Sequence, residues 1–533
     1  MNTNREVYKR LKIQNYRFMK YIIFTLLLII LTPYVSIFSQ SVQELKLNDR
    51  FIKDKSFRFD HKKELLDLSS LPPLSLNENS YHGLKKLKPK SKYLKRTEYI
   101  PYESKKHFGI AVGELAIVEF IPFAYSRWIK DWSKTPDEKN WTKISFESVW
   151  NNISSGYEYD TDNFLTNYFA HPYHGNLYFN TGRTNGYNFW ESTAFAFAGS
   201  AIWEFFAETF RPSFNDWINT SVNGINFGET LYRLSGMITD NEAKGSERVW
   251  REIGGAIVNP VRGFNRLITG ETYKIYPNPE YGRPKEFSIA LSAGLRTIWI
   301  DSSTTGKQEY YTLDQGSFML NVNYGNPFKT KEPFSHFFFT LGLTSGDPKM
   351  TSLISSGYLY GWDLKKNEKV HHKLKFDLEY NYTNNPGYLF GETALIPSLL
   401  SSFKIGKETS LITRLGFNGI LMGGTPNDYD TLAEGRTYDL GPGIGARFGF
   451  EIRGKKWSYL TAGYSGSYIY TVSDPGSSKH YLQFAVLGLK YPIKDYFAIG
   501  LEGIIYWKSS NYDNYPHVYK QIPIVRLLFY TLM

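Results

Sequence analysis

From about residue 285 to residue 533 the chain alternates apolar and polar residues in segments of strand length. Leu374 and Phe376 lie on one face of such a segment, and Lys375 and Asp377 lie on the other. Successive side chains of a strand point to opposite faces, so the pattern produces one apolar and one charged surface. A barrel with lipid outside and a polar lumen inside needs both surfaces. The pattern therefore predicts a C-terminal antiparallel transmembrane β-barrel.

Turn sequences divide this region into about a dozen segments of roughly 10 residues, the length that a tilted strand needs to cross a bilayer. The clearest turn signals lie at residues 345–348, 384–387 and 474–476. A soluble β-sandwich also alternates. The barrel is favoured because the apolar face is rich in aromatic residues while the other face carries small, polar and charged ones. We expect about 12 spanning strands.

The first 39 residues have the order of a secretory signal peptide: basic, then apolar, then small residues. Basic residues between Arg5 and Lys20 precede an apolar run over residues 21–31, and Ser36 and Ser39 follow. The run is about half of the roughly 20 residues that a helical span needs, which favours cleavage over anchoring. We expect export to the cell outer membrane. The chain has no cysteine, which excludes disulfides, thiolate metal sites and an N-terminal lipid anchor on cysteine.

Residues 40–106 are predicted to be a basic linker, partly disordered, because they show no sustained hydrophobic period. Cations concentrate at residues 84–96 of a chain whose net charge is +11. Such a run can contact anionic lipid, but its composition favours a solvated linker. Nucleic acid is excluded as a partner, because no recognition motif accompanies the charge in an exported chain. The expected partners are outer-membrane lipid and the barrel-assembly machinery.

Residues 107–270 are predicted to form a mainly helical domain. Its longest segments are residues 108–129, which are apolar, and residues 188–210, which end just before Pro212. Ser213 followed by Asp216 is typical of a helix start. Because a barrel of about 12 strands encloses a narrow lumen, we expect the helices to form a plug in the lumen or a periplasmic domain at its mouth.

Residues 167–233 contain the side chains that can carry chemistry. Glu204 and Glu208 are four residues apart, so a helix places both on one largely apolar face, where their repulsion should raise one pKa. His171 and His174 are expected in a turn before a helix. With Asp216, these residues are candidates for acid–base catalysis or for binding Zn, Fe or Mn.

A structural role for the same residues stays open. Glu204, Glu208, Asp216 and Glu229 could instead pair with cations in the lumen, and Asp216 could only cap its helix. The lumen cations are Arg296, Lys375, Arg414, Arg447 and Arg453. The block contains no serine-hydrolase elbow, no His-Glu-x-x-His pattern and no phosphate-binding loop.

The same block resembles an uncharacterised bacterial family of outer-membrane type, domain of unknown function 3943. The shared residues are His171, Pro172, Tyr173, His174, Gly175, Trp203, Glu204, Glu208, Pro212, Ser213, Asn215, Asp216, Gly224, Gly228, Glu229 and Arg233. The family has no assigned activity, so the resemblance implies no catalytic residue and no cofactor.

Two functions remain from the sequence. The first is an envelope scaffold or narrow gated conduit, in which the helical domain occludes or caps the barrel. The second is an outer-membrane enzyme that acts on envelope lipid or glycan through His171, His174, Glu204, Glu208 and Asp216. The two differ in whether these five side chains converge on one site or each meet an arginine or a backbone group.

Overall fold

The computed structural model describes residues 100–131, 140–160, 162–279, 283–302, 309–429, 437–472 and 478–533. The predicted signal peptide and the linker up to residue 99 lie outside these residues. The chain divides into two units, residues 1–100 and 101–533. All the helices and strands described below belong to the second unit.

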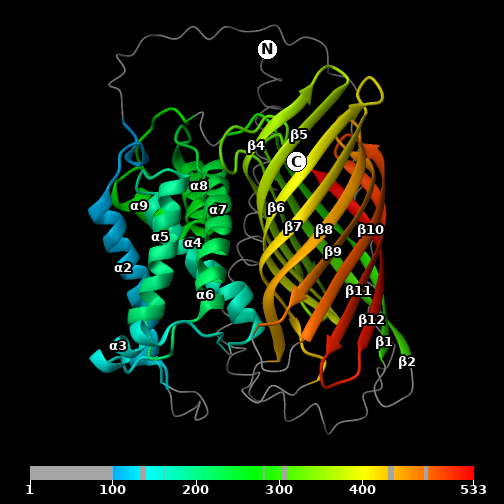
Figure 1. The fold of residues 1–533 in the computed structure, drawn as a ribbon. Coiled ribbons are helices and arrows are strands. Elements are labelled where there is room, and N and C mark those ends of the chain that lie inside the picture. Colours follow the sequence, from blue (N-terminus) through cyan, green and yellow to red (C-terminus); the bar gives the residue numbers. More distant parts are fainter. Residues whose placement is uncertain are drawn as a thin grey trace, which may run out of the picture. The chain divides into compact units, whose positions relative to one another are not determined.

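The C-terminal part is a closed antiparallel barrel, in which sequence neighbours pair and β1 closes on β12 (Figure 1). Its 12 strands in the described part of the chain are β1 (Phe287–Ser302), β2 (Glu309–Tyr324), β3 (Phe337–Thr344), β4 (Met350–Lys366), β5 (Val370–Asn385), β6 (Tyr388–Lys404), β7 (Ser410–Pro426), β8 (Tyr438–Arg453), β9 (Ser458–Tyr470), β10 (Ser478–Lys494), β11 (Phe497–Tyr512) and β12 (Val518–Leu532). The predicted fold class, a barrel of about 12 strands preceded by helices, is confirmed.

Contacts across the barrel identify the face that points into the lumen. Arg296 on β1 donates from Nη1 to Oδ1 of Asn385 on β5 over 2.9 Å, although β1 and β5 are not neighbours. Asn385 shares its face of β5 with Asp377 and Glu379, because side chains alternate along a strand. The predicted polar face of this strand is therefore the lumen face, and Leu378 points outward.

Side chains fill the lumen. The rings of Tyr388 on β6 and Tyr506 on β11 are 4.6 Å apart. They belong to an apolar cluster of Ile298, Ile300, Tyr388, Phe390, Ile469, Leu482, Ile504, Tyr506, Ile522 and Ile524, which comes from six strands. Clusters of this kind give a narrow barrel a packed interior instead of an open pore.

The lumen cations have partners within the barrel. Arg447 lies 2.7 Å from Glu379 and 3.4 Å from Glu392, and Arg414 lies 2.7 Å from Asp377. Lys375 also contacts Asp377, Arg453 contacts Glu451, and Arg296 bonds to Gln315. The prediction that these cations pair with carboxylates of the helical domain is therefore wrong, since they bond to side chains of the barrel itself, on the same strand or on other strands.

The helical part runs from η2 (Tyr102–Ser104) to α9. It comprises α2 (Phe108–Ala124), η3 (Tyr125–Ile129), α3 (Phe146–Ser155), η5 (Thr166–Ala170), α4 (His171–Arg183), α5 (Phe189–Ile202), η6 (Trp203–Ala207), α6 (Phe214–Ile218), η7 (Asn219–Asn223), α7 (Gly224–Ile238), α8 (Gly245–Val258) and α9 (Pro260–Ile268). Side-chain caps begin several of these helices. Asn188 and Glu191 form a capping box at α5, and Asn259 precedes Pro260 at α9.

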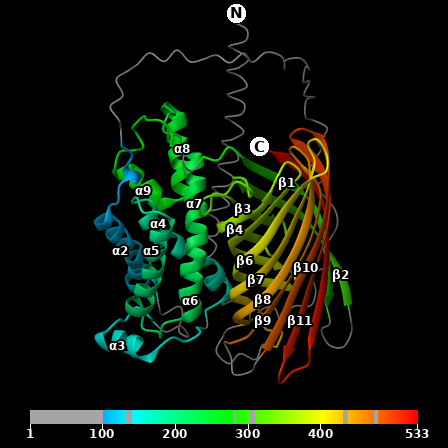
Figure 2. The ribbon, with the colours of Figure 1, turned by 45° about the horizontal axis from the view of Figure 1, so that its top comes forward.

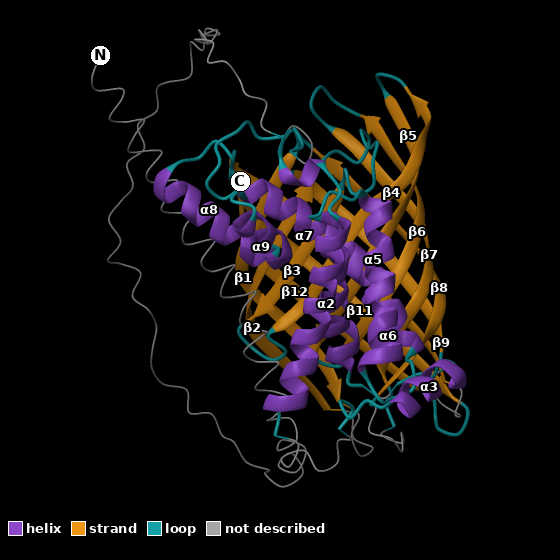
Figure 3. Ribbon diagram, turned by 90° about the vertical axis from the view of Figure 1, so that its left-hand side faces the viewer, coloured by secondary structure: helices purple, strands orange, loops and turns teal. Residues whose placement is uncertain are grey.

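The helices pack against the outer wall of the barrel (Figures 1 and 3). Asn226 on α7 donates to the backbone oxygens of Ser355 on β4, over 3.1 Å, and Leu378 on β5, over 2.8 Å. Phe227 lies on the ring of Tyr380, with centroids 4.6 Å apart. Leu378 and Tyr380 are on the outward face, so the expectation of a plug inside the lumen is wrong. The outward face at these strands is apolar because it contacts helices.

A tyrosine of the helical domain packs against two glycines of the barrel wall. A Cβ on Gly391 would lie 2.5 Å from the ring of Tyr168, and one on Gly424 would lie 2.6 Å from its hydroxyl oxygen. Tyr168 is 0% exposed, and its backbone oxygen accepts a hydrogen bond from Tyr380. The close approach needs residues without side chains, which explains these glycines within strands.

Where no helix covers the barrel, we expect the outer face to contact lipid. On β10, Leu487 is 53% exposed near the middle of the strand and Tyr491 is 75% exposed near its end. Leu487→Arg should destabilise the inserted barrel by about 2–4 kcal/mol, while Tyr491→Arg should cost about 0–1 kcal/mol, because the penalty falls toward the interface. Heat-modifiable gel mobility of membrane fractions measures the folded level. Equal levels for both variants would contradict a bilayer centred on Leu487.

Candidate functional site

Three π-helical turns gather the candidate residues at the end of the bundle that holds α3 and α6 (Figures 1 and 2). Turn η5 runs directly into α4, so His171 and His174 lie in the first turn of that helix. The predicted turn before a helix is wrong, because the π-helical turn keeps the chain helical. Turn η6 carries Glu204, and η7 follows α6, which carries Asp216. Such turns are frequent at functional sites.

His171 meets three aspartates. Its Nε2 lies 3.4 Å from Oδ2 of Asp216 and 3.6 Å from Oδ2 of Asp162. Asp160 completes the group, and one ligand atom from each of the four residues lies within 4.8 Å of the others. The four side chains come from three separate segments, the stretch before η5, the start of α4, and α6. We call Asp160, Asp162, His171 and Asp216 the His–Asp cluster.

Buried amides and a hydroxyl hold the cluster in place. Asn215 donates from Nδ2 to Asp160 over 2.7 Å and to Asp216 over 2.9 Å. Asn167 donates from Nδ2 to Asp160 over 3.2 Å and to the hydroxyl of Tyr438 over 2.7 Å. Since Tyr438 is the first residue of β8, the barrel helps to position the cluster, and the cluster lies at the level of the strand ends, outside the membrane-spanning segments.

Glu204 and Glu208 lie beside the cluster but not on one helical face. Glu204 is 2% exposed, and its Oε2 accepts the backbone N–H of Ser213 over 2.6 Å. The hydroxyl of Ser213 accepts the backbone N–H of Asp216 and so caps α6. Ser213 therefore bonds both to Glu204 and to Asp216. Glu208 is extended, because the helix ends at Ala207, and the prediction of a shared helical face is wrong. The ring of His174 packs between Tyr178 and Trp203.

Burial has the largest effect on the pKa of each of these groups. It raises the pKa of Glu204 to about 8, against the lowering effect of the Ser213 N–H, and it raises the pKa of Glu208 and of Asp216 well above their ordinary values. Burial lowers the pKa of His174 to about 4, and His171 adds to this shift. For His171 burial also acts downward, but Asp162, Asp160 and Glu204 together outweigh it, so the pKa of His171 is raised.

The structure brings His171 and Asp216 together, places Glu204 and Glu208 next to them, and leaves His174 against aromatic rings. Sequence reasoning missed Asp160 and Asp162. The signal that points to them is an Asp-x-Asp pair in a short non-helical stretch, just before the histidines. Alternate residues of an extended stretch share a side, so both carboxylates can face one partner.

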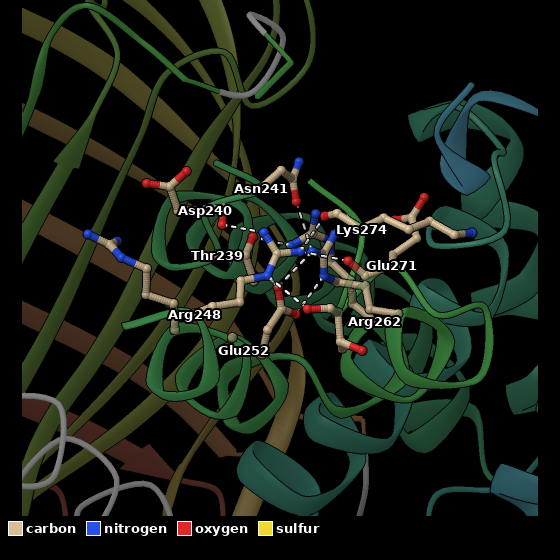
Figure 4. Close-up of polar contacts among 12 residues, drawn as sticks. Thr239, Asp240, Asn241, Arg248, Glu252, Arg262, Glu271 and Lys274 are labelled. Carbon is tan, nitrogen blue, oxygen red and sulfur yellow. Dashed lines mark hydrogen bonds and ion pairs between the residues drawn. The ribbon is translucent and has the colours of Figure 1, made fainter. Parts of the chain in front are cut away.

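A second charged cluster of the helical domain has a structural role. Figure 4 shows Arg248 and Glu252 on α8 beside Arg262 on α9, with Glu271 close to them. Arg248 lies 2.9 Å from Glu252 and donates to the backbone oxygen of Glu271 over 2.6 Å. Arg266 bridges Glu252, at 2.7 Å, and Glu271, at 3.3 Å. Arginines balance the carboxylates here, whereas the His–Asp cluster joins three carboxylates to one imidazole.

Such a set suits a divalent cation. One imidazole nitrogen and three carboxylate oxygens are ligands of Zn²⁺, Mn²⁺ and Fe²⁺. Bonds of about 2.0–2.2 Å place neighbouring ligand atoms about 3–4 Å apart. The ligand atoms lie within 4.8 Å of one another, so the widest spacing must contract by about 1 Å for a cation to bind all four. The bonds from Asn167 and Asn215 to the carboxylates are the kind of outer contact that orients ligands.

Comparison with known proteins bears on this same region. Residues 156–261 match the family described as Domain of unknown function (DUF3943). The matched residues lie within the helical segment. The resemblance stated from the sequence is thereby confirmed. Asp160 and Asp162, which the resemblance did not include, also fall within the matched residues. No curated protein matches the chain.

Several solved structures match part of the chain at low sequence identity. The KdgM porin has 12% identity and a TM-score of 0.22, covering 46% of this chain and 98% of its own. The NanC porin has 10% identity and a TM-score of 0.25, covering 46% and 99%. The Pseudomonas putida toluene transporter TodX has 8% identity and a TM-score of 0.22, covering 47% and 90%. The DUF3943 assignment and the barrel topology do not depend on these likenesses.

Proposed function

We propose that this protein is an outer-membrane enzyme that holds a divalent cation in the His–Asp cluster and acts on the headgroup of a membrane lipid. The observation that carries the proposal is the convergence of four ligand atoms within 4.8 Å from three separate segments. Folding brings these side chains together against the mutual repulsion of three carboxylates, and a bound cation offsets that repulsion.

The residues present support hydrolytic or group-transfer chemistry. A divalent cation polarises an ester or phosphoryl oxygen and activates a bound water. Glu204 and Glu208, beside the cluster, are the candidates for moving the proton, a role that carboxylates take in general acid–base catalysis. His174 has a supporting position, because it packs against Trp203, the neighbour of Glu204.

Helix α3 supports a lipid as the substrate. Phe146, Trp150 and Ile153 form an apolar stripe at helical spacing and are 87%, 60% and 51% exposed. A helix of this kind lies in the interface of a bilayer. Asn152, on its buried side, donates to the backbone oxygen of Glu208 over 2.9 Å. The helix thus links a membrane surface to the segment that carries Glu204 and Glu208.

The barrel connections support the outer leaflet. The cluster lies at the end of the barrel where five of the six connections between the described strands have at least five residues. At the opposite end three of the five connections have four residues or fewer, although the longest connection, between β2 and β3, is also there. Outer-membrane barrels have their longer loops outside the cell. A conduit through the barrel stays a prediction. It would require the rings of Tyr388 and Tyr506, which pack together in the lumen, to separate.

Metal titration of the detergent-purified protein tests the proposal. After treatment with a chelator, calorimetry with Mn²⁺ and Zn²⁺ should show one site in the wild type. Asp162→Asn should weaken binding by at least about tenfold, because it removes a ligand. Glu158→Gln is the matched control: its side chain is 41% exposed and that of Asp162 is 52% exposed, and both lie in the same stretch.

Turnover separates the two parts of the proposal. Envelope lipids incubated with the loaded and the chelator-treated protein should show product only with the loaded one. Absence of metal binding in the wild type would reject the site. Binding that Asp162→Asn abolishes, without turnover of any envelope lipid, would leave a metal site and reject the enzyme.

A further inference from the structure

We infer that the helical domain is immersed in the bilayer beside the barrel, with lipid acyl chains in contact with α2 and α5. This inference is independent of the metal site. It rests on the polarity of the helical bundle, on the length of α2, and on the surface that the bundle shares with the barrel.

The bundle is apolar outside and polar inside, the reverse of a soluble helical domain. On α2, Ile117, Phe120 and Ile121 are 53%, 55% and 61% exposed. Further exposed apolar side chains on α2 and η3 are Phe108, Ile110, Val112, Trp128 and Ile129, and those on α5 and η6 include Trp190, Ile202 and Phe206. The interior holds Asn180 and Glu229, both 0% exposed. Exposed apolar side chains gathered on one surface mark contact with a membrane or with another protein.

Helix α2 with η3 has the dimensions of a membrane span. Residues Phe108–Ile129 form 22 helical residues whose best window has a mean hydropathy of 1.6 and is 22% buried. At 1.5 Å per residue this is about 33 Å, close to the hydrocarbon thickness of about 30 Å. Its two acidic residues point inward, since Glu114 accepts from Asn185 over 2.7 Å and Glu119 from Tyr178 over 3.0 Å.

The bundle shares its surroundings with the barrel. Figure 3 shows the helices in front of the barrel wall, and α7 bonds to the outward side of β4 and β5. On strands without helices, that same outer surface exposes Leu295 (67%), Leu501 (50%) and Leu527 (48%). A bilayer around these strands therefore meets the bundle at its edges. Helices satisfy their own backbone hydrogen bonds, so they can lie in hydrocarbon.

The absence of cysteine makes a direct test practical. Single variants Ile117→Cys on α2, Leu487→Cys on the exposed barrel face and Lys407→Cys in the exposed turn between β6 and β7 are labelled with an environment-sensitive fluorophore. Each labelled full-length protein is reconstituted into phosphatidylcholine vesicles with and without lipids brominated on their acyl chains. None of the three positions belongs to the His–Asp cluster.

The label at Ile117→Cys should show blue-shifted emission and should lose intensity with brominated lipid as strongly as the label at Leu487→Cys. The label at Lys407→Cys should show neither effect. Water-like emission at Ile117→Cys would overturn the inference. Blue-shifted emission without quenching, together with disulfide-linked dimers of the unlabelled variant, would also overturn it and would assign this face to a second copy of the chain.

Discussion

Glu229→Gln is expected to destabilise the helical domain by about 3–5 kcal/mol, the cost of leaving buried charges without their partner. Glu229 is 0% exposed and lies 2.8 Å from the Nε of Arg183 on α4 and 2.8 Å from the Nε of Arg233 on α7. It therefore links two helices of the bundle core. Glutamine keeps the volume but removes the charge that balances two guanidinium groups.

Thermal unfolding in detergent, followed by far-ultraviolet circular dichroism at a helical wavelength, measures this effect. Glu247→Gln is the matched control, because Glu247 also pairs with an arginine four residues on, Arg251, but its side chain is 38% exposed. An exposed pair of this kind contributes about 0.3–0.5 kcal/mol. Equal midpoints for the two variants would show that the Glu229 network does not hold the bundle together.

Gly175→Ala should separate α4 from η7 and α7, at a cost of about 3 kcal/mol or more, the upper end for overpacking, because the obstacle is backbone. A Cβ at this position would lie 1.7 Å from the backbone oxygen of Thr220 and 2.9 Å from the Cα of Gly224. Small residues that let helices approach closely are typical of helices in membranes. The level of assembled protein and the helical unfolding midpoint should both fall.

Gly113→Ala gives the comparison. Gly113 is on the exposed side of α2, and a Cβ there would meet nothing within 4 Å. The same substitution should then be neutral or stabilising by up to about 1 kcal/mol, since alanine favours helix. If Gly175→Ala behaved like Gly113→Ala, the close crossing of α4 and η7 would be wrong.

The barrel could be predicted from the sequence because its signal is local. On β5 the alternation of apolar and charged residues assigns each side chain to a face without knowledge of any other strand, and the contact between Arg296 and Asn385 agrees with that assignment. What lies against each face is a separate question. Leu378 points outward, as expected, but it packs beside α7 and not against lipid.

The candidate site could be predicted only in part. His171 and Asp216 lie in residues 167–233, where ionisable side chains concentrate, so the sequence alone identifies both as candidates. Their distance of 3.4 Å depends on the packing of α4 against η7, which continues from α6, and no local pattern specifies this packing. Glu208 was misplaced for a related reason: the helix unwinds after a π-helical turn, so a spacing of four residues no longer meant one face.

The sequence by itself determined the strands, the lumen face, the approximate extent of the helical region and the family of its central block, because each depends on residues close together in the chain. Only the tertiary structure decided that the helices lie outside the barrel and that Asp160 and Asp162 join His171 and Asp216. Both results come from contacts between distant segments, such as Asn226 with β4 and β5 and Asn167 with Tyr438. An apolar face has the same composition whether it contacts lipid or another helix, so the pattern alone cannot distinguish the two.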